Sequence, residues 1–158
     1  MIKIIAVGKI KEAYLQDAIA EYTKRLSAYT NLEIIQVADE KCGEGISEKE
    51  ADSVRDKEGE RILKNIKDDD YVITLEIGGK QMSSEEFSGF IENLEVTGRS
   101  GIVFVIGGSI GLSKSVSSRS NYKLSFSRMT FPHQLMRVIL LEQIYRAYKI
   151  MRHEPYHK

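Results

Sequence analysis

The chain has 158 residues and a mass of 17.9 kDa, and its 23 Lys and Arg residues balance its 23 Asp and Glu residues. This length predicts one globular domain, residues 1–158, which must recognise any large partner through its own surface or through a second copy of itself. The longest apolar stretches, 102–106 and 138–141, are far shorter than the roughly 20 residues of a membrane span, and the first residues lack the features of a signal peptide. We therefore expect a protein of the cytoplasm.

Apolar periodicity predicts strands and helices that alternate along the chain. Residues 2–7 form the first predicted strand, 11–27 a helix with one apolar stripe, and 32–37 a second strand. A polar loop at 39–46 leads to a charged helix at 47–66, opened by Ser47 and Glu50 in capping-box spacing. We expect much of this helix to be solvated.

The second half repeats this alternation. Strands are predicted at 71–77, 101–106 and 122–126, and helices at 83–94, 112–118 and from Pro132 to about Arg152. The strand at 101–106 is almost continuously apolar, which is typical of a strand buried on both faces. The pattern predicts an α/β fold with a mostly parallel sheet flanked by helices.

Three segments that follow predicted strands have an unusual composition. They are 75–80, 106–112 and 124–133, and the first two contain the pairs Gly78-Gly79 and Gly107-Gly108. Ligands bind at the carboxyl ends of the strands of an open parallel sheet, and glycines let the backbone approach a ligand closely. The glycines lack the spacing of dinucleotide or triphosphate loops. If they do more than end strands, they favour a ligand with an aromatic base and little phosphate.

The last predicted helix is apolar on more than one side. Between Leu135 and Met151, 12 of 17 residues are apolar, which is too many for one inward stripe. A second subunit in a twofold dimer would bury the excess, and the alternative is a central core helix in a monomer. Within it, Glu142 and Arg146 have the spacing of a structural ion pair.

The charge is distributed unevenly along the chain. Residues 1–95 carry 13 basic and 21 acidic side chains, whereas residues 96–158 carry 10 basic and 2 acidic ones. A run of six cations without a nearby acid predicts a positive surface for phosphate or nucleic acid, unless acidic helices of the first half neutralise it. These cations are Arg99, Lys114, Arg119, Lys123, Arg128 and Arg137.

The histidines and the cysteine make a metal site improbable. Cys42 is the only cysteine, and the three histidines have no repeated spacing, so we expect no metal. His133 is interpreted as a cap or anion contact at a helix start. The terminal Tyr156-His157-Lys158 is either a frayed end or a compact set of proton-transfer and phosphate-contact groups.

Several motifs together resemble a known family. The segments are Gly107–Gly111, Leu124–Arg137, Leu141–Ala147 and the terminal Tyr156-His157, and the resemblance begins at Ile4–Lys9. They are similar to the bacterial pseudouridine methyltransferases of the large ribosomal subunit, of the RlmH type, which belong to the SPOUT class. Lys158 extends beyond the Tyr-His that usually ends these chains.

The resemblance implies a fold feature, a cofactor and a partner. SPOUT proteins thread their C-terminal segment through a loop to form a trefoil knot, work as homodimers and bind S-adenosyl-L-methionine in a bent form. The implied cofactor positions in this chain are Leu75, Gly107, Phe126, Ser127, Arg128, Met129, Thr130 and Phe131.

The resemblance also implies the reaction, which is methylation of N3 of a pseudouridine in 23S rRNA on the assembled ribosome. Positioning of the methyl donor and removal of the N3 proton are the two catalytic tasks. We assign His157 as the base or base-orienting group, Tyr156 as a holder of the base or ribose, and Arg146 as a stabiliser of developing charge or a phosphate contact.

Two other readings compete with this function. A non-enzymatic ribosome-associated protein would use only the positive half to grip rRNA, which would not require glycine loops. A SPOUT enzyme acting on tRNA is the second, although the match at Phe131–Gln134 and Tyr156-His157 favours the ribosomal branch. With one domain per chain, we expect both subunits of a dimer to contribute to each site.

Overall fold

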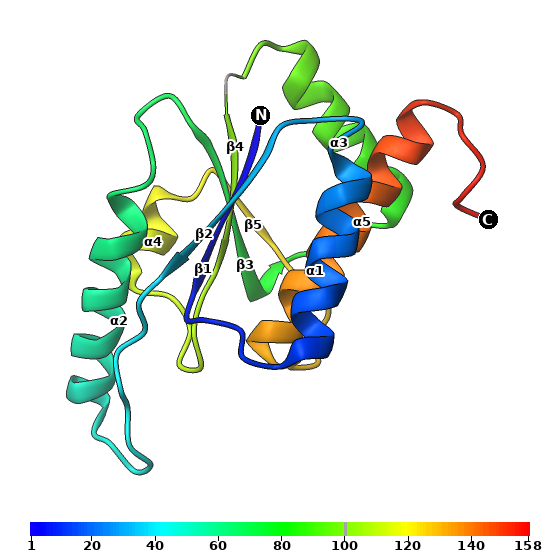
Figure 1. The fold of residues 1–158 in the computed structure, drawn as a ribbon. Coiled ribbons are helices and arrows are strands. Elements are labelled where there is room, and N and C mark those ends of the chain that lie inside the picture. The colour runs from blue at the N-terminus through cyan, green and yellow to red at the C-terminus, as the bar shows by residue number, and fades with distance from the viewer. Residues whose placement is uncertain (100) are drawn as a thin grey trace.

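A five-stranded parallel sheet forms the centre of the molecule. A computed structural model describes residues 1–99 and 101–158, and its strands are β1 (Ile2–Val7), β2 (Leu32–Val37), β3 (Tyr71–Lys80), β4 (Ile102–Ile106) and β5 (Tyr122–Leu124). They lie in the order β2-β1-β4-β3-β5, and every pairing is parallel. All carboxyl ends therefore point to one edge, the lower edge of the sheet in Figure 1.

Helices cover both faces of this sheet (Figure 1). On one face lie α1 (Ala13–Leu26), α3 (Ser84–Val96) and α5 (His133–Met151), and on the other lie α2 (Glu48–Leu63) and α4 (Lys114–Arg119). The larger core cluster joins the sheet to α3 and α5, and the smaller one joins it to α2 and α4. All five residues of β4 are buried, as the apolar composition of this central strand predicts.

The predicted α/β class and the order of elements are confirmed, with differences at a few ends. β3 continues to Lys80, beyond the predicted end at residue 77, because Ser125 N–H donates to Lys80 O (2.9 Å) and holds the two segments together. β5 stops at Leu124 rather than 126, where the chain leaves the sheet to form a loop. The caps follow the sequence: Ser47 accepts from Glu50 N–H, and Ser83 with Glu86 forms a complete capping box.

The helix α5 is covered from two sides within one subunit. It packs against α1 and α3 as well as on the sheet. Its buried residues are Arg137, Leu140, Leu141, Ile144, Tyr145, Ala147 and Tyr148. Much of the excess apolar surface is thus buried without a second chain, while Leu135 remains 36% exposed and Val138 and Ile139 are only half-buried.

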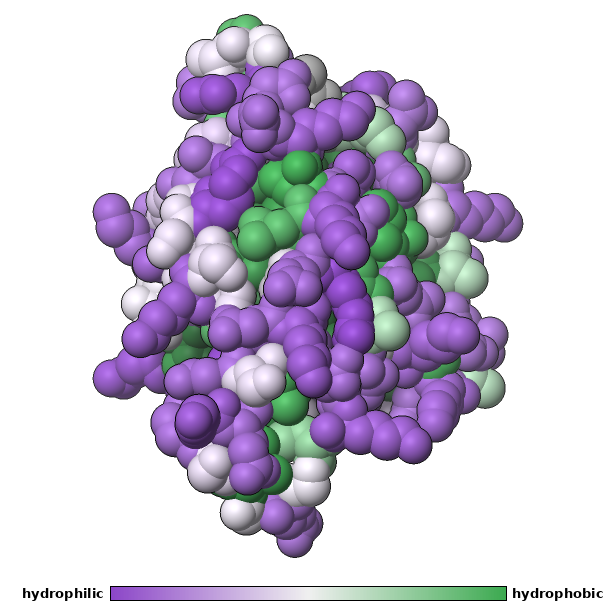
Figure 2. All heavy atoms as spheres, turned by 90° about the vertical axis from the view of Figure 1, so that its left-hand side faces the viewer, coloured by the Kyte–Doolittle hydropathy of each residue, from purple (hydrophilic) through white to green (hydrophobic). Residues whose placement is uncertain are grey.

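The helix α2 is largely solvated. Only Ala51, Glu58, Gly59 and Ile62 are buried, so the predicted solvation of this helix is confirmed. Figure 2 looks onto this side of the molecule, where hydrophilic side chains dominate and apolar atoms are visible mainly between them. Across the two described ranges, no helix has the length and apolarity to cross a bilayer.

Candidate active site

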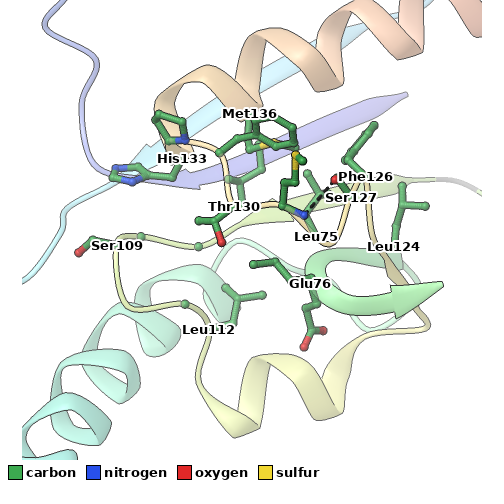
Figure 3. A pocket seen from close by; sticks show the side chains of 18 of the residues that line it. Leu75, Glu76, Ser109, Leu112, Leu124, Phe126, Ser127, Thr130, His133 and Met136 are labelled. Atoms are coloured by element: carbon green, nitrogen blue, oxygen red, sulfur yellow. Dashed lines mark hydrogen bonds between the residues drawn. The ribbon is translucent and has the colours of Figure 1, made fainter. Parts of the chain in front are cut away.

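A pocket of about 750 Å³ opens at the carboxyl edge of the sheet. Its walls are the second half of β3, the ends of β4 and β5 with the segments that follow them, and the first turn of α5. Figure 3 shows side chains from all of these segments, among them Leu75, Leu112, Phe126 and Met136, around the cavity. A volume of this size is within the range of small-molecule and cofactor sites, and the position is where parallel sheets bind ligands.

Seven of the eight predicted cofactor residues line this pocket. They are Leu75, Gly107, Phe126, Ser127, Met129, Thr130 and Phe131. The eighth, Arg128, is exposed and is not among the lining residues. The fold therefore brings together positions separated by more than 50 residues in the sequence. Three further lining residues, Glu76, Leu112 and Met136, had no individual assignment. Glu76 and Leu112 belong to segments that were singled out at strand ends, whereas Met136 lies in the first turn of α5.

The glycine loop after β4 is shaped by close packing. A Cβ added at Gly107 would lie 3.0 Å from Leu112 Cδ2 and 3.1 Å from the carbonyl carbon of Gly111. Gly111 has a φ of +86°, and its N–H donates to Gly108 O (3.1 Å), which closes a tight turn. Glycine suits position 107 because a side chain would crowd Leu112 and Gly111, and position 111 because its φ is positive.

The described polar groups on the pocket wall offer a phosphate no cationic side chain. Among the described residues that line it there is no Lys or Arg, and Glu76 is the only carboxylate. Thr74 Oγ1 donates to Glu76 Oε2 (2.6 Å), and Ser117 Oγ donates to Glu76 Oε1 (3.1 Å), so the carboxylate extends toward α4, as Figure 3 shows. A phosphate would meet no cation here, whereas a neutral or positively charged ligand would not be repelled.

His133 is the other titratable residue on the pocket wall. Burial is the main cause that lowers its pKa, and the Arg137 guanidinium lowers the pKa further, while Asp39 and Glu12 oppose these effects. The imidazole is therefore neutral at neutral pH, and the pocket gains no positive charge from it.

The predicted catalytic residues lie together at another place, between α3, the second half of α5 and the C-terminal tail. Arg146 stands over the Tyr156 ring, 4.7 Å from its centroid, and Tyr156 also packs edge-on against Tyr145 at 5.0 Å. Glu142 accepts from Arg146 Nη2 (2.6 Å), so the predicted ion pair is present. The structure thus orders the tail against α5 in a single subunit.

Both ring nitrogens of His157 are engaged. Arg146 Nη1 donates to Nδ1 (3.1 Å), and because a guanidinium only donates, the ring proton belongs on Nε2, which donates to Glu85. Glu85 is a contact that sequence reasoning missed, since it lies 72 residues away at the start of α3. In this arrangement His157 has no free lone pair with which to take a proton.

We call Glu85, Glu142, Arg146, Tyr156 and His157 the tail cluster. It shares no residue with the described lining of the pocket. Arg146, Tyr156 and His157 are not among the described lining residues of the pocket. From Met136 at the pocket to Arg146 the chain advances ten residues of α5, which corresponds to about 15 Å along the helix axis. One subunit therefore holds two separate groups of predicted functional residues.

Of the six cations that have no acidic residue nearby in the sequence, two have structural roles. Arg137 is only 3% exposed, and its Nη2 donates to Val7 O (2.7 Å) and Gly8 O (2.8 Å) at the end of β1. Arg119 Nη2 donates to the carbonyls of Lys67 and Asp70. Lys114, Lys123 and Arg128 are exposed. Within residues 1–99 and 101–158 there is also no group of three metal-ligating side chains.

Comparison with known proteins agrees with this architecture. The protein is of the α/β class, with a glycine-lined pocket at the strand ends, where such folds bind small ligands. A sequence model described as "Predicted SPOUT methyltransferase" matches residues 1–157. The chain therefore belongs to the SPOUT methyltransferase family.

Curated relatives extend over the same length. The chain is 60% identical to "Ribosomal RNA large subunit methyltransferase H" of Clostridium beijerinckii and 62% identical to the protein of that name in Clostridium botulinum. It is 61% identical to "Putative ribosomal RNA large subunit methyltransferase H" of Methanococcus vannielii. Each alignment spans 157 residues, which is 99% of both chains.

Proposed function

We propose that the protein transfers a methyl group from S-adenosyl-L-methionine to N3 of a pseudouridine in 23S rRNA, and that it acts on the assembled ribosome in the cytoplasm. The observation that carries this proposal is the full-length similarity to ribosomal RNA large subunit methyltransferases H, at 60 to 62% identity. The chain keeps the glycine loops of an enzyme, which a protein that only gripped rRNA would not need.

The pocket residues fit this cofactor. The ligand would carry a sulfonium cation and an adenosine without phosphate, and the wall offers apolar side chains, one carboxylate and no Lys or Arg in the described part of the chain. Leu75, Gly107 and 126–131 would hold it, mainly through the backbone and through apolar contacts. Without a Cβ at Gly107, the loop can pack tightly on Leu112 and Gly111 beside the pocket. When bound, the cofactor would supply a methyl group on an activated sulfur.

The remaining tasks belong to the side chains of the tail cluster. As the new N–C bond forms, N3 of the uracil ring must lose its proton, and we assign its removal to His157. Since Arg146 occupies Nδ1, this role requires Arg146 to turn from the imidazole toward the substrate, where the guanidinium would stabilise negative charge on a carbonyl oxygen. Tyr156, which packs between Arg146 and Tyr145, would hold the base or the ribose.

We further propose that the active form is a homodimer in which the tail of one subunit completes the pocket of the other. The separation of the pocket from the tail cluster within one subunit supports this arrangement. Apolar side chains that line the pocket and are exposed, Met129 (74% exposed), Ile77 (53%) and Phe131 (37%), offer a surface for such a contact.

A trefoil knot at the C-terminal half is part of the same proposal. It is supported by membership of the SPOUT methyltransferase family.

The direct test is transfer of labelled methyl from S-adenosylmethionine to whole ribosomes, separated subunits and free rRNA, followed by mass spectrometry of the nucleosides. We expect methylated pseudouridine from whole ribosomes only. Cofactor binding without transfer to any of these substrates would move the search to tRNA, and absence of cofactor binding would favour a non-enzymatic rRNA-binding protein.

Sharing of the site between subunits is tested with a mixed dimer. One subunit carries Gly107→Trp and the other Arg146→Ala, and each variant is also assayed as a pure dimer. If the tail acts in trans, the mixed dimer retains one intact site, whereas both pure dimers are inactive. A mixed dimer as inactive as the pure ones would contradict the shared site.

A further inference from the structure

Glu58 on α2 is a buried carboxyl group that the proposed chemistry does not use. Its side chain is 4% exposed, although it belongs to a largely solvated helix. Oε2 accepts the Glu40 N–H (3.0 Å), while Oε1 is buried and has no hydrogen-bond partner within the two described ranges. A buried carboxyl with one unpartnered oxygen is costly, so its position calls for an explanation.

The Glu58 carboxyl faces the outer side of the glycine loop. A Cβ added at Gly108 would lie 3.4 Å from Glu58 Oε1, 3.6 Å from Oε2 and 3.2 Å from Val7 Cγ1. Gly108 itself lines the pocket, so the loop lies between the carboxyl and the ligand space. The carboxyl thus supports the loop from behind.

Two other residues of α2 contact this loop or the start of α4 that follows it. Arg55 Nε donates to Ile110 O (2.9 Å), and Asp52 in turn accepts from Arg55 Nη1 (2.6 Å). A Cβ at Gly59 would lie 2.4 Å from Ser113 Oγ, so α2 packs directly on the residue that caps α4. Residues 55, 58 and 59 lie on one face of the helix, at spacings of three and four.

Electrostatics around Glu58 favour a neutral carboxyl. Burial is the largest cause that raises its pKa, and the Asp39 and Glu40 carboxylates raise the pKa as well, whereas the Glu40 N–H and the Arg61 guanidinium lower it. Glutamine has the shape of the neutral acid and retains an oxygen that can accept the Glu40 N–H. It is therefore the conservative replacement at this position.

We propose that Glu58 is a positioning residue, which braces the Gly107–Gly111 loop in the shape that binds the methyl donor. The effect on the loop follows from packing alone, while the effect on ligand affinity rests on the proposed function. Glu58 acts through the loop and does not itself contact the ligand.

The test measures two quantities in wild type, Glu58→Ala and Glu58→Gln. They are hydrogen exchange of the amides in residues 106–112 and the dissociation constant of S-adenosylmethionine from calorimetry. Because Ala removes the contact and leaves the Glu40 N–H without its acceptor, we expect about tenfold faster exchange of the loop and about tenfold weaker binding. Glu58→Gln should stay within roughly twofold of wild type in both quantities.

Glu60→Ala is the matched control, because Glu60 lies on the same helix and is exposed. Unchanged loop exchange in Glu58→Ala would overturn the inference, and so would equal loss in Glu58→Gln or a uniform rise in exchange that includes β1 and β4. If wild type fails to bind S-adenosylmethionine while loop exchange still rises in Glu58→Ala alone, the proposed function falls and the positioning role stands.

Gly108→Ala tests the same contact from the loop side and also serves if Glu58→Ala does not fold. Its methyl group would crowd Val7 and Glu58, so we expect faster loop exchange in this variant. In the double variant with Glu58→Ala the methyl group gains space, and the combined effect should be smaller than the product of the two single effects. Strictly multiplicative effects would show that the two residues are independent, and a Gly108→Ala loop that exchanges as in wild type would also contradict the brace.

Discussion

The pocket at the strand ends and the cluster at the tail are built on opposite principles. The pocket consists of backbone, glycine and apolar side chains, and its carboxylate, Glu76, is occupied by hydroxyl groups of Thr74 and Ser117. The tail cluster is a network of charges and rings formed by Glu85, Glu142, Arg146, Tyr156 and His157. In the proposed function, the pocket would hold a cofactor without phosphate by its shape, and the charged groups of the tail would serve removal of a proton from the RNA base.

The two regions also differ in how strongly they are fixed. The pocket end is tied to the core by Arg137, which is buried and bonded to the backbone of β1. The tail is held by contacts of partly exposed groups, such as His157 with Glu85, whose side chains are 27% and 61% exposed. Since exposed polar contacts of this kind contribute little to stability, we expect the tail to rearrange more readily than the pocket.

The largest expected effect is a loss of methyl transfer while binding of the cofactor to the pocket is retained. His157→Ala should lower methyl transfer to ribosomes by roughly 10²- to 10⁴-fold, because a general base contributes that much to rate. Binding of S-adenosylmethionine, measured by calorimetry, should be unchanged. His153→Ala is the control, since His153 is exposed and is not a member of the tail cluster. Equal turnover in wild type and His157→Ala would remove His157 from the mechanism.

A substitution in the glycine loop should weaken binding of the cofactor. Gly107→Val places side-chain carbons where a Cβ already lies 3.0 Å from Leu112 and 3.1 Å from Gly111, and we expect roughly hundredfold weaker binding of S-adenosylmethionine. Gly43→Val is the control, because a Cβ there meets nothing within 4 Å. If calorimetry gives the same affinity for Gly107→Val as for wild type, the ligand does not use this loop.

Smaller effects on stability and on cofactor affinity are expected when the pH is lowered. The His133 pKa is lowered in the folded protein, so the folded state binds this proton less readily than the unfolded chain, and stability declines as the pH falls below 6.5. A protonated His133 would also repel a sulfonium, and affinity should fall by roughly threefold to tenfold as the imidazole titrates. His133→Asn should flatten the calorimetric pH profile, and a profile of the same slope in this variant would assign the dependence to another group.

The smallest expected effect is on the stability of the fold when the tail is released. Glu85→Gln weakens the contact with His157 Nε2, yet both partners are partly exposed, so the melting temperature should stay within the error of calorimetry. Amide exchange in residues 153–158 should increase. A clear drop in melting temperature would show that the tail is part of the folded core. The tail would then be fixed as strongly as the pocket end.

Local patterns were sufficient to predict most elements of the fold. The apolar run 102–106, the stripe of α1 and the serines that cap α2 and α3 act over a few residues, so their structures follow from the sequence near them. The strand-end segments that form the pocket were predicted for a similar reason, because carboxyl ends of parallel strands must meet at one edge. The ends of β3 and β5 were missed because each depends on the contact between Lys80 and Ser125, which are distant in sequence.

The sequence by itself determined the α/β class, the order of elements and the chemistry that each segment carries, because hydrophobic period and residue type are local properties. Only the tertiary structure decided which of these groups meet. It buried Arg137 at the end of β1, placed Glu58 behind the glycine loop and brought Glu85 to His157 across 72 residues. These contacts depend on the strand order and on the packing of α5 between α1 and α3, which no local pattern encodes.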